Sequence, residues 1–179
     1  MFKFTFTLND DSYYELNKWH NLNSPAGKKN LFRYRARMPL VSLLVISIFL
    51  LTNMDLVLVI GVAVVLTVLS FLWIVLAKAM FLKHLRRNIN IMKKSGKLPY
   101  GGGNTLLFNE DVFVSVAPEK ETKVKYSAIE RIVETESYIF IFTSSIQAVI
   151  IPRSAFSDDA EKVRFIAFLE SKKAENPGA

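Results

Sequence analysis

The chain has 179 residues, of which 51% are hydrophobic, and a formal net charge of +7. It contains no cysteine, which excludes disulfides, thiolate nucleophiles and cysteine-ligated metals, and its two histidines, His20 and His84, have no partner at metal-site spacing. Residues 1–37 carry a charge of +4 and residues 78–100 carry +7, whereas residues 101–179 carry −3. This distribution argues against nucleic-acid binding by the folded part of the chain.

The first 37 residues predict a strand, a helix and a basic segment. Apolar and polar residues alternate over residues 2–8, a pattern typical of a strand with one buried face. Residues 9–12 can then start a helix, because Asn and Asp cap helix N-termini and acids suit the first turn. We expect this helix to stop near residues 23–25, and the basic residues 27–37 follow it.

Two apolar runs come next, separated by a short polar turn. Residues 56–77 carry no charge and are long enough to cross the roughly 30 Å hydrocarbon core of a bilayer. Residues 38–54 are shorter, near the lower limit for a span, and Asn53 and Asp55 lie in the turn. Together the runs predict a transmembrane helical hairpin. The alternatives are a buried helix of a soluble protein, for which this chain is too small, and a cleaved signal peptide, which the late start and the second run disfavour.

Charge predicts the orientation of this hairpin. Lys and Arg flank both runs, whereas Asp55 alone marks the turn. The positive-inside rule therefore predicts that both termini are cytoplasmic and that Asp55 is outside. Small residues are expected to let the two helices approach closely, namely Ser42 and Ser47 on the first and Gly61 and Ala63 on the second.

Beyond the hairpin we expect a basic helical extension at residues 78–98, a β domain at residues 99–175 and a tail at residues 176–179. Short β-like runs separated by two to five residues favour an antiparallel meander, and they cover residues 105–108, 112–116, 122–126, 129–134, 138–143 and 147–151. Ser157 is expected to cap a last helix that carries acids in its first turn and bases in its last.

Six strands and one amphipathic helix outline a pleckstrin-homology-like barrel, and the strand at residues 2–8 would supply the seventh strand. The predicted fold is therefore a membrane α+β protein, in which a two-helix transmembrane hairpin is inserted into a cytoplasmic antiparallel β barrel closed by a C-terminal helix. Residues 1–37 would pack on the C-terminal domain. Pro152 should end the last strand, because it cannot donate to a ladder. Phe156 is expected to be buried and Arg153 exposed.

Several short motifs carry a family resemblance. They are FTFTLNDD at residues 4–11 with Tyr14, NSPAGKK at 23–29, the apolar hairpin, YSAI at 126–129, YIFIF at 138–142 and IIPRSAF at 150–156. With these motifs the chain resembles the YcxB-like family of small bacterial membrane proteins, over nearly its whole length. The resemblance implies a pleckstrin-homology-like C-terminal domain on a two-helix anchor in the bacterial inner membrane. It implies no reaction, substrate or catalytic residue.

No motif in the chain indicates catalysis. Residues 94–97 and 101–103 lack the Gly-Lys-Ser/Thr ending and the strand-to-helix turn of a phosphate loop, so a linker explains them better. The neighbouring Asp158 and Asp159 are more typical of a helix start than of a catalytic carboxylate pair. We therefore expect no catalytic residue, no cofactor and no metal, and the chain is not expected to be an enzyme.

The basic flanks are the feature that indicates a ligand. Juxtamembrane Lys and Arg attract anionic lipid headgroups, at about 1 kcal/mol each near the surface. The simpler explanation is that these residues set the topology and touch lipid incidentally. The candidate anionic-lipid contacts are Lys28, Lys29, Arg33, Arg35, Arg37, Lys78, Lys83, Arg86 and Arg87.

The sequence thus favours a non-enzymatic, membrane-anchored cytoplasmic binding or scaffolding module. Its expected partners are membrane lipids and either a protein or a second copy of the chain, and not nucleic acid. The alternative is a small subunit or regulator of a membrane transport or envelope enzyme complex. A stoichiometric transporter or enzyme that co-purifies in mild detergent would favour this alternative.

Overall fold

A computed structural model describes residues 2–52, 54–96, 103–117 and 120–175. These residues form two compact units: Met1–Leu16 with Asn90–Ala179 makes the first, and Asn17–Ile89 makes the second. Several expected features lie outside the described residues. These are Asn53 of the turn, residues 97, 101 and 102 of the linker, the boundary between residues 98 and 99, and the tail at residues 176–179.

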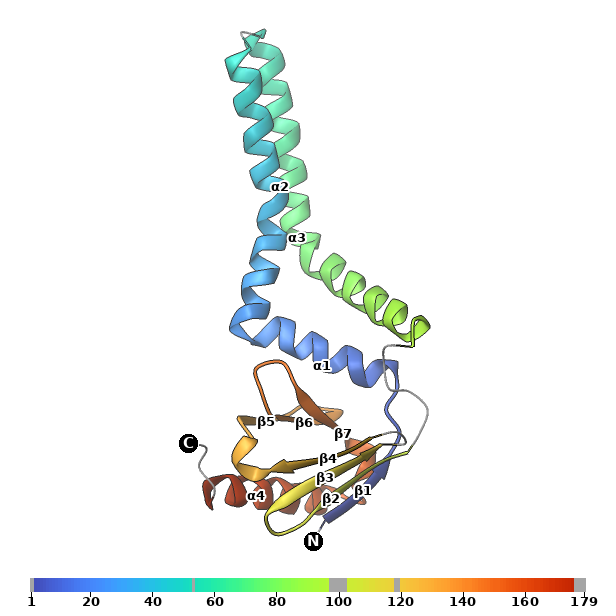
Figure 1. The fold of residues 1–179 in the computed structure, drawn as a ribbon. Coiled ribbons are helices and arrows are strands. Elements are labelled where there is room, and N and C mark those ends of the chain that lie inside the picture. Colours follow the sequence, from blue (N-terminus) through green and yellow to red (C-terminus); the bar gives the residue numbers. More distant parts are fainter. Residues whose placement is uncertain (1, 53, 97–102, 118–119, 176–179) are drawn as a thin grey trace. The chain divides into compact units, whose positions relative to one another are not determined.

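The first unit contains a four-stranded antiparallel sheet in the order β1-β2-β3-β4 (Figure 1). Its strands are β1 (Phe2–Phe6), β2 (Asn104–Phe108), β3 (Val112–Ala117) and β4 (Lys120–Lys125). β1 pairs with β2, with Phe4 opposite Leu106, so the N-terminal strand joins the strands beyond the hairpin as the sequence predicted. Alternation along β1 turns Phe4 inward, where its exposed fraction is 2%.

A second antiparallel sheet has three strands in the order β5-β6-β7. They are β5 (Arg131–Glu134), β6 (Tyr138–Phe142) and β7 (Ala148–Pro152). Residues 139–142 of the central strand are all buried. β7 ends at Pro152, as expected for a residue that cannot donate to a ladder.

All seven predicted strands differ from the observed ones by one or two residues at one or both ends. The runs predicted at residues 122–126, 129–134 and 147–151 are observed as β4, β5 and β7, with the bounds given above. A 3-10 turn, η1 (Tyr126–Ala128), separates β4 from β5. Tyr126 begins this turn; its ring is fully buried and its hydroxyl donates to the carbonyl oxygen of Asn109 at 2.7 Å.

The seven strands do not close into a barrel, which corrects the pleckstrin-homology-like barrel expected from the sequence. No ladder joins the two sheets within the described residues. Instead, the helix α4 (Asp159–Glu175) inserts Phe165 and Leu169 into a core that both sheets share. The Phe165 ring lies 4.9 Å from that of Phe4 and 4.8 Å from that of Phe108. The two sheets are thus joined through this core and not through a ladder.

The residue that caps α4 also differs from the prediction. Ser157 was expected, but α4 begins at Asp159, and Asp158 Oδ1 accepts a hydrogen bond from the Glu161 N–H at 2.6 Å. Ser157 instead donates from its backbone N and its Oγ to Glu161 Oε2, at 2.7 and 2.8 Å. These bonds lower the pKa of the Glu161 carboxyl. Ser and Asp cap about equally well, so the sequence alone did not discriminate between neighbours.

The corner before α4 agrees with the sequence. It contains a 3-10 turn, η2 (Arg153–Ala155), followed by Phe156. Phe156 is buried, with its ring 4.7 Å from that of Phe4 and 5.6 Å from that of Phe165. Arg153 is exposed and its guanidinium pairs with Asp159. Both placements are therefore confirmed.

The second unit is helical. It contains the end of α1 (Asp10–Asn23), all of α2 (Pro25–Leu51) and most of α3 (Leu56–Lys94). Ser24 caps α2, because its Oγ accepts from the Gly27 N–H at 3.0 Å, and Pro25 suits the first helical position. The basic residues 27–37 are thus already helical, and residues 38–51 of the run predicted at 38–54 form the second half of α2, which ends at Leu51.

α2 and α3 are long and apolar enough to cross a membrane. Only 6% of the most apolar 18-residue stretch of each helix is buried by the rest of the described chain. Neither helix therefore serves as a core helix. The turn residue Asp55 caps the N-terminus of α3, since its Oδ1 accepts hydrogen bonds from the N–H groups of Val57 at 2.8 Å and Leu58 at 3.3 Å.

Serines join the two apolar helices. Ser42 and Ser70 are buried, and their hydroxyls lie 2.8 Å apart. Two of the small residues predicted at this interface lie elsewhere. A Cβ added at Gly61 would meet no atom within 4 Å, and the Ser47 hydroxyl bonds the Leu43 carbonyl oxygen of its own helix. The facing pair could not be chosen from sequence, because the helices' relative rotation decides it.

Candidate functional site

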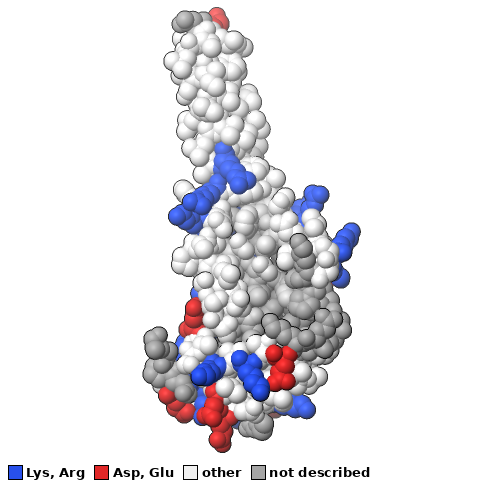
Figure 2. Space-filling view, in the orientation of Figure 1, with Lys and Arg blue, Asp and Glu red and all other residues white. Residues whose placement is uncertain are grey.

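The nine predicted lipid contacts are all helical, on α2 and α3 of the second unit. Figure 2 shows most of this two-helix part as white surface, with the basic side chains confined to one end. Among the nine, Arg33 and Arg37 line a common pocket, and the other seven do not line it. Arg35 differs from them, because its Nε is buried and makes no hydrogen bond to a described residue.

The pocket, called the basic pocket below, has a volume of about 540 Å³. It opens between the end of α1, the first half of α2 and the later part of α3. Two arginines and a histidine supply the basic groups, three asparagines supply amides, and two aromatic rings and a leucine complete the wall. The lining residues are Asn21, Asn30, Arg33, Tyr34, Arg37, Phe81, His84, Leu85 and Asn88.

Aromatic contacts hold α2 against α3 beside this pocket. The Tyr34 ring lies 5.3 Å from that of Trp73 and 5.5 Å from that of Phe81. Trp73 Nε1 donates to the Tyr34 carbonyl oxygen at 3.2 Å, and the Arg37 guanidinium lies 5.6 Å from the centre of the Tyr34 ring. The Tyr34 contacts with Trp73 and Phe81 join α2 to α3 beside the pocket that the arginines and His84 line.

The wall supplied by α1 depends on a glycine. A Cβ added at Gly27 would lie 2.4 Å from Asn21 Cα and 2.5 Å from the Asn21 and His20 carbonyl oxygens. The end of α1 can therefore approach α2 this closely because residue 27 has no side chain. Asn21 Nδ2 donates to the Asn17 carbonyl oxygen at 2.8 Å, which orients its amide at the edge of the pocket.

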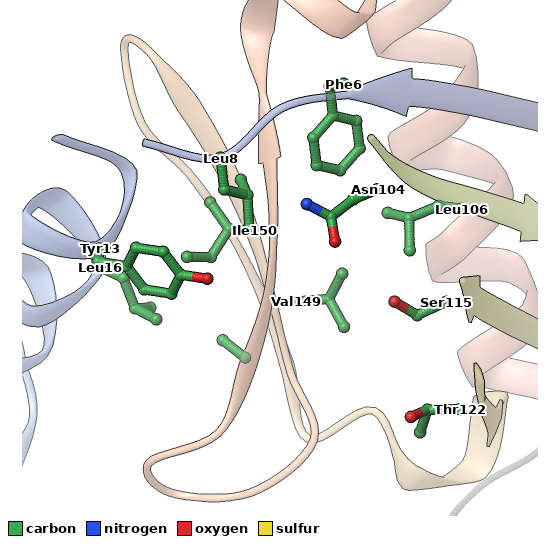
Figure 3. Close-up of a pocket in the computed structure, with 11 residues that line it drawn as sticks. Phe6, Leu8, Tyr13, Leu16, Asn104, Leu106, Ser115, Thr122, Val149 and Ile150 are labelled. Atoms are coloured by element: carbon green, nitrogen blue, oxygen red, sulfur yellow. The ribbon is translucent and has the colours of Figure 1, made fainter. Parts of the chain in front are cut away.

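A second cavity lies in the first unit, between the two sheets, and is called the seam below (Figure 3). Its volume is about 330 Å³, and no charged residue lines it. Apolar side chains from β1, β2, β7 and the chain after β1 form its walls, with Tyr13 and Leu16 of α1 beside them. The lining residues are Phe6, Leu8, Tyr13, Leu16, Asn104, Leu106, Ser115, Thr122, Ala148, Val149 and Ile150.

Three polar side chains face the seam from the four-stranded sheet. Ser115 lies opposite Leu106 and also opposite Thr122 in the strand register, so these residues form one row across the sheet, and Asn104 lies one row away. Figure 3 shows the Asn104, Ser115 and Thr122 side chains on one wall of the cavity, with Val149 of β7 beside them. None of the three makes a side-chain hydrogen bond to another described residue.

The sequence analysis did not identify the seam. Asn104, Ser115 and Thr122 lie on three strands and form no motif along the chain. The sequence holds one indication of their position. Each lies on the inward-facing side of its strand, and that side of the same strands also carries Phe108, Phe113 and other core residues. That signal becomes readable only once the register is known.

The described residues contain no group of three or more His, Cys, Asp or Glu side chains that could hold a metal ion. Burial and then the nearby Asp111 charge raise the pKa of Tyr126 to about 12. This tyrosine is enclosed in the core and lines neither cavity. Its shift thus reflects packing.

Comparison with known proteins gives one match. Residues 108–169, from the end of β2 into α4, match the family model described as YcxB-like protein. No curated protein and no solved structure is significantly similar to the chain. The match leaves out β1 and both apolar helices. The family resemblance read from the sequence is therefore confirmed for residues 108–169, which form a YcxB-like domain.

Proposed function

We propose that the protein is a non-enzymatic, membrane-anchored binding module. In this proposal α2 and α3 cross the bacterial inner membrane, both termini lie in the cytoplasm, and the β domain presents the seam to a protein partner. The apolar, mostly exposed surface of α2 and α3 supports the anchor. The basic residues at one end of the hairpin support the orientation.

The observation that carries the binding role is the lining of the seam. Asn104, Ser115 and Thr122 leave hydrogen-bonding groups without a described partner beside apolar walls. Specific ligand sites combine apolar walls with a few polar groups that fix orientation. Because no lining residue carries a charge, the partner segment would be uncharged, with one or two apolar side chains and hydrogen-bonding groups.

Topology is the first test. Reporter fusions at Ala179 and between Thr52 and Asp55 would show on which side each point lies. We expect a cytoplasm-dependent reporter to be active at Ala179 and an externally active reporter to work in the turn. A cytoplasmic reporter that is silent at Ala179 would refute the orientation.

The seam is tested by filling it. Thr122→Trp would place a large ring in the cavity, whereas Lys123→Trp adds the same ring on the opposite face of β4. Co-purification in mild detergent followed by mass spectrometry should recover a partner with the wild type and with Lys123→Trp, but not with Thr122→Trp. Equal recovery with all three proteins would exclude the seam as the binding surface. A stoichiometric transporter or enzyme as partner would support the role of subunit or regulator.

A further inference from the structure

We propose that the basic pocket binds a phosphate group, and that in the membrane this is the phosphate of an anionic phospholipid. The inference rests on the proposed membrane anchor and extends it, since it separates two of the nine basic flanking residues from the rest. Four features of the pocket support it. They are hydrogen-bond donors without a partner, the spacing of these donors on two helices, the depth of the arginines in the membrane and the exposed apolar surface next to them.

The pocket contains donors that the protein does not use. Arg33 and Arg37 form no salt bridge or hydrogen bond with a described residue, and neither do the side chains of Asn30, His84 and Asn88. No acidic residue lines the pocket. Both arginines are exposed, and no lining carboxylate balances their positive charge, so the pocket attracts anions.

The spacing of these donors suits a phosphate. Arg33 and Arg37 are four residues apart on α2, and His84 and Asn88 are four residues apart on α3, so each pair lies on one helix face. Guanidinium forks match phosphate oxygens in a bidentate way, which an ammonium group does not. The tyrosine stacking described above already orients Arg37. These donors from two helices line one pocket.

The depth of the two arginines agrees with a lipid headgroup. Arg33 and Arg37 precede the apolar run at residue 38 by five and one residues, which is about 2–8 Å along a helix. The headgroup layer occupies roughly 5–8 Å on each side of the hydrocarbon core. Tyr34 and Trp73, which are residue types enriched at membrane interfaces, lie at the same level of the hairpin.

The lipid's acyl chains would continue along the exposed apolar face. Leu40 and Leu44 of α2 follow directly after the basic residues and are 63% exposed each. A phospholipid satisfies both the donors and this apolar surface. A soluble phosphate ester would satisfy the donors alone. The lipid therefore uses more of the observed surface.

The test uses the full chain in a neutral detergent, titrated with phosphatidylglycerol or phosphatidylcholine and analysed by native mass spectrometry. We expect phosphatidylglycerol to bind more tightly. Arg33→Gln with Arg37→Gln should weaken its binding roughly 30-fold, the factor for two basic groups near a headgroup. Lys28→Gln with Lys29→Gln, which removes the same charge outside the pocket, should change the affinity less than about threefold. Equal losses in the two double variants would mean diffuse attraction and overturn the proposal.

A charge-conserving pair makes the test independent of folding and of net charge. Arg33→Lys with Arg37→Lys keeps both charges but removes the guanidinium forks. Phosphate recognition predicts weaker binding of phosphatidylglycerol by this variant, whereas unchanged binding would refute it. Glycerol 1-phosphate distinguishes the sources of phosphate. Failure to displace the lipid supports a headgroup site, and displacement at the lipid's own concentration would overturn the lipid assignment in favour of a soluble ester.

Discussion

Gly27 should not tolerate even alanine, because the last turn of α1 packs against the first turn of α2 at this residue. A Cβ at residue 27 would lie 2.4–2.5 Å from three backbone atoms of His20 and Asn21. Carbon atoms normally approach to about 3.5–4.0 Å. The contacted atoms belong to the backbone and cannot rotate away, so the end of α1 would have to move by roughly 1 Å.

The magnitude follows from two opposing terms. Overpacking costs about 1–3 kcal/mol, and a clash with backbone lies toward the upper end of that range. Gly27 lies in the first turn of α2, and replacing a helical glycine by alanine returns at most about 0.5–1 kcal/mol. Gly27→Ala should therefore destabilise the protein by about 1–2 kcal/mol. Gly61→Ala meets no atom within 4 Å and should be neutral or stabilising by up to about 1 kcal/mol.

Thermal unfolding of the full chain in detergent, followed by circular dichroism, would compare the two variants. We expect the midpoint to fall for Gly27→Ala and to stay level or rise for Gly61→Ala. The affinity of Gly27→Ala for phosphatidylglycerol should also fall, because Asn21 borders the basic pocket. A midpoint for Gly27→Ala at or above the wild-type value would refute the close packing of α1 on α2.

Three further predictions concern single contacts. Phe156→Ala should lower the free energy of unfolding by roughly 3–5 kcal/mol, measured by thermal unfolding. Arg153→Ala should change it by no more than about 0.5 kcal/mol. The reverse order would mean that Arg153 is a buried structural or ligand-binding charge. Removing either hydroxyl of the Ser42–Ser70 pair should cost about 0.6 kcal/mol, with the double variant less than additive in the same assay. The pKa of Tyr126 is raised from 10.0 to about 12. The protonated hydroxyl therefore contributes fully to the free energy of unfolding below pH 10, and this contribution is lost as the pH rises toward 12. Tyr126→Phe should flatten that part of the stability profile, and an unchanged slope would contradict the assignment.

The features that sequence predicted well are those that one segment encodes by itself. The apolar run at residues 56–77 and the charges around it indicate a long exposed helix without reference to any neighbour. The alternating phenylalanines of β1 indicate a buried face, and the shortage of a seventh strand further along the chain indicated where that face belongs. Phe156 followed from its position between Pro152 and a helix start.

The features that sequence missed depend on how separate segments meet. The two separate sheets depend on which strands pair with which, and no segment encodes that by itself. The seam needs the register of three strands, and the basic pocket needs the relative rotation of α2 and α3. Sequence could name Arg33 and Arg37 among nine basic residues, but only the helix contacts separate them from the others.

Energetics explain how a domain can remain intact when its first strand is separated from its second by two long helices. Loop closure becomes less favourable by about 0.6 kcal/mol for each doubling of length, so the long connection from Phe6 to Asn104 costs about 3 kcal/mol more than a tight hairpin. Burial of an aromatic side chain contributes about 1.5–3 kcal/mol, and β1 brings Phe2, Phe4 and Phe6 to the core. The free energy gained by burying these rings therefore exceeds the entropic cost of the long connection. In the proposed topology the antiparallel hairpin also returns the chain to the side it left, which shortens the effective loop further. Deleting residues 1–8 should consequently increase hydrogen exchange across residues 105–151, and unchanged exchange would show that β1 contributes nothing to that domain.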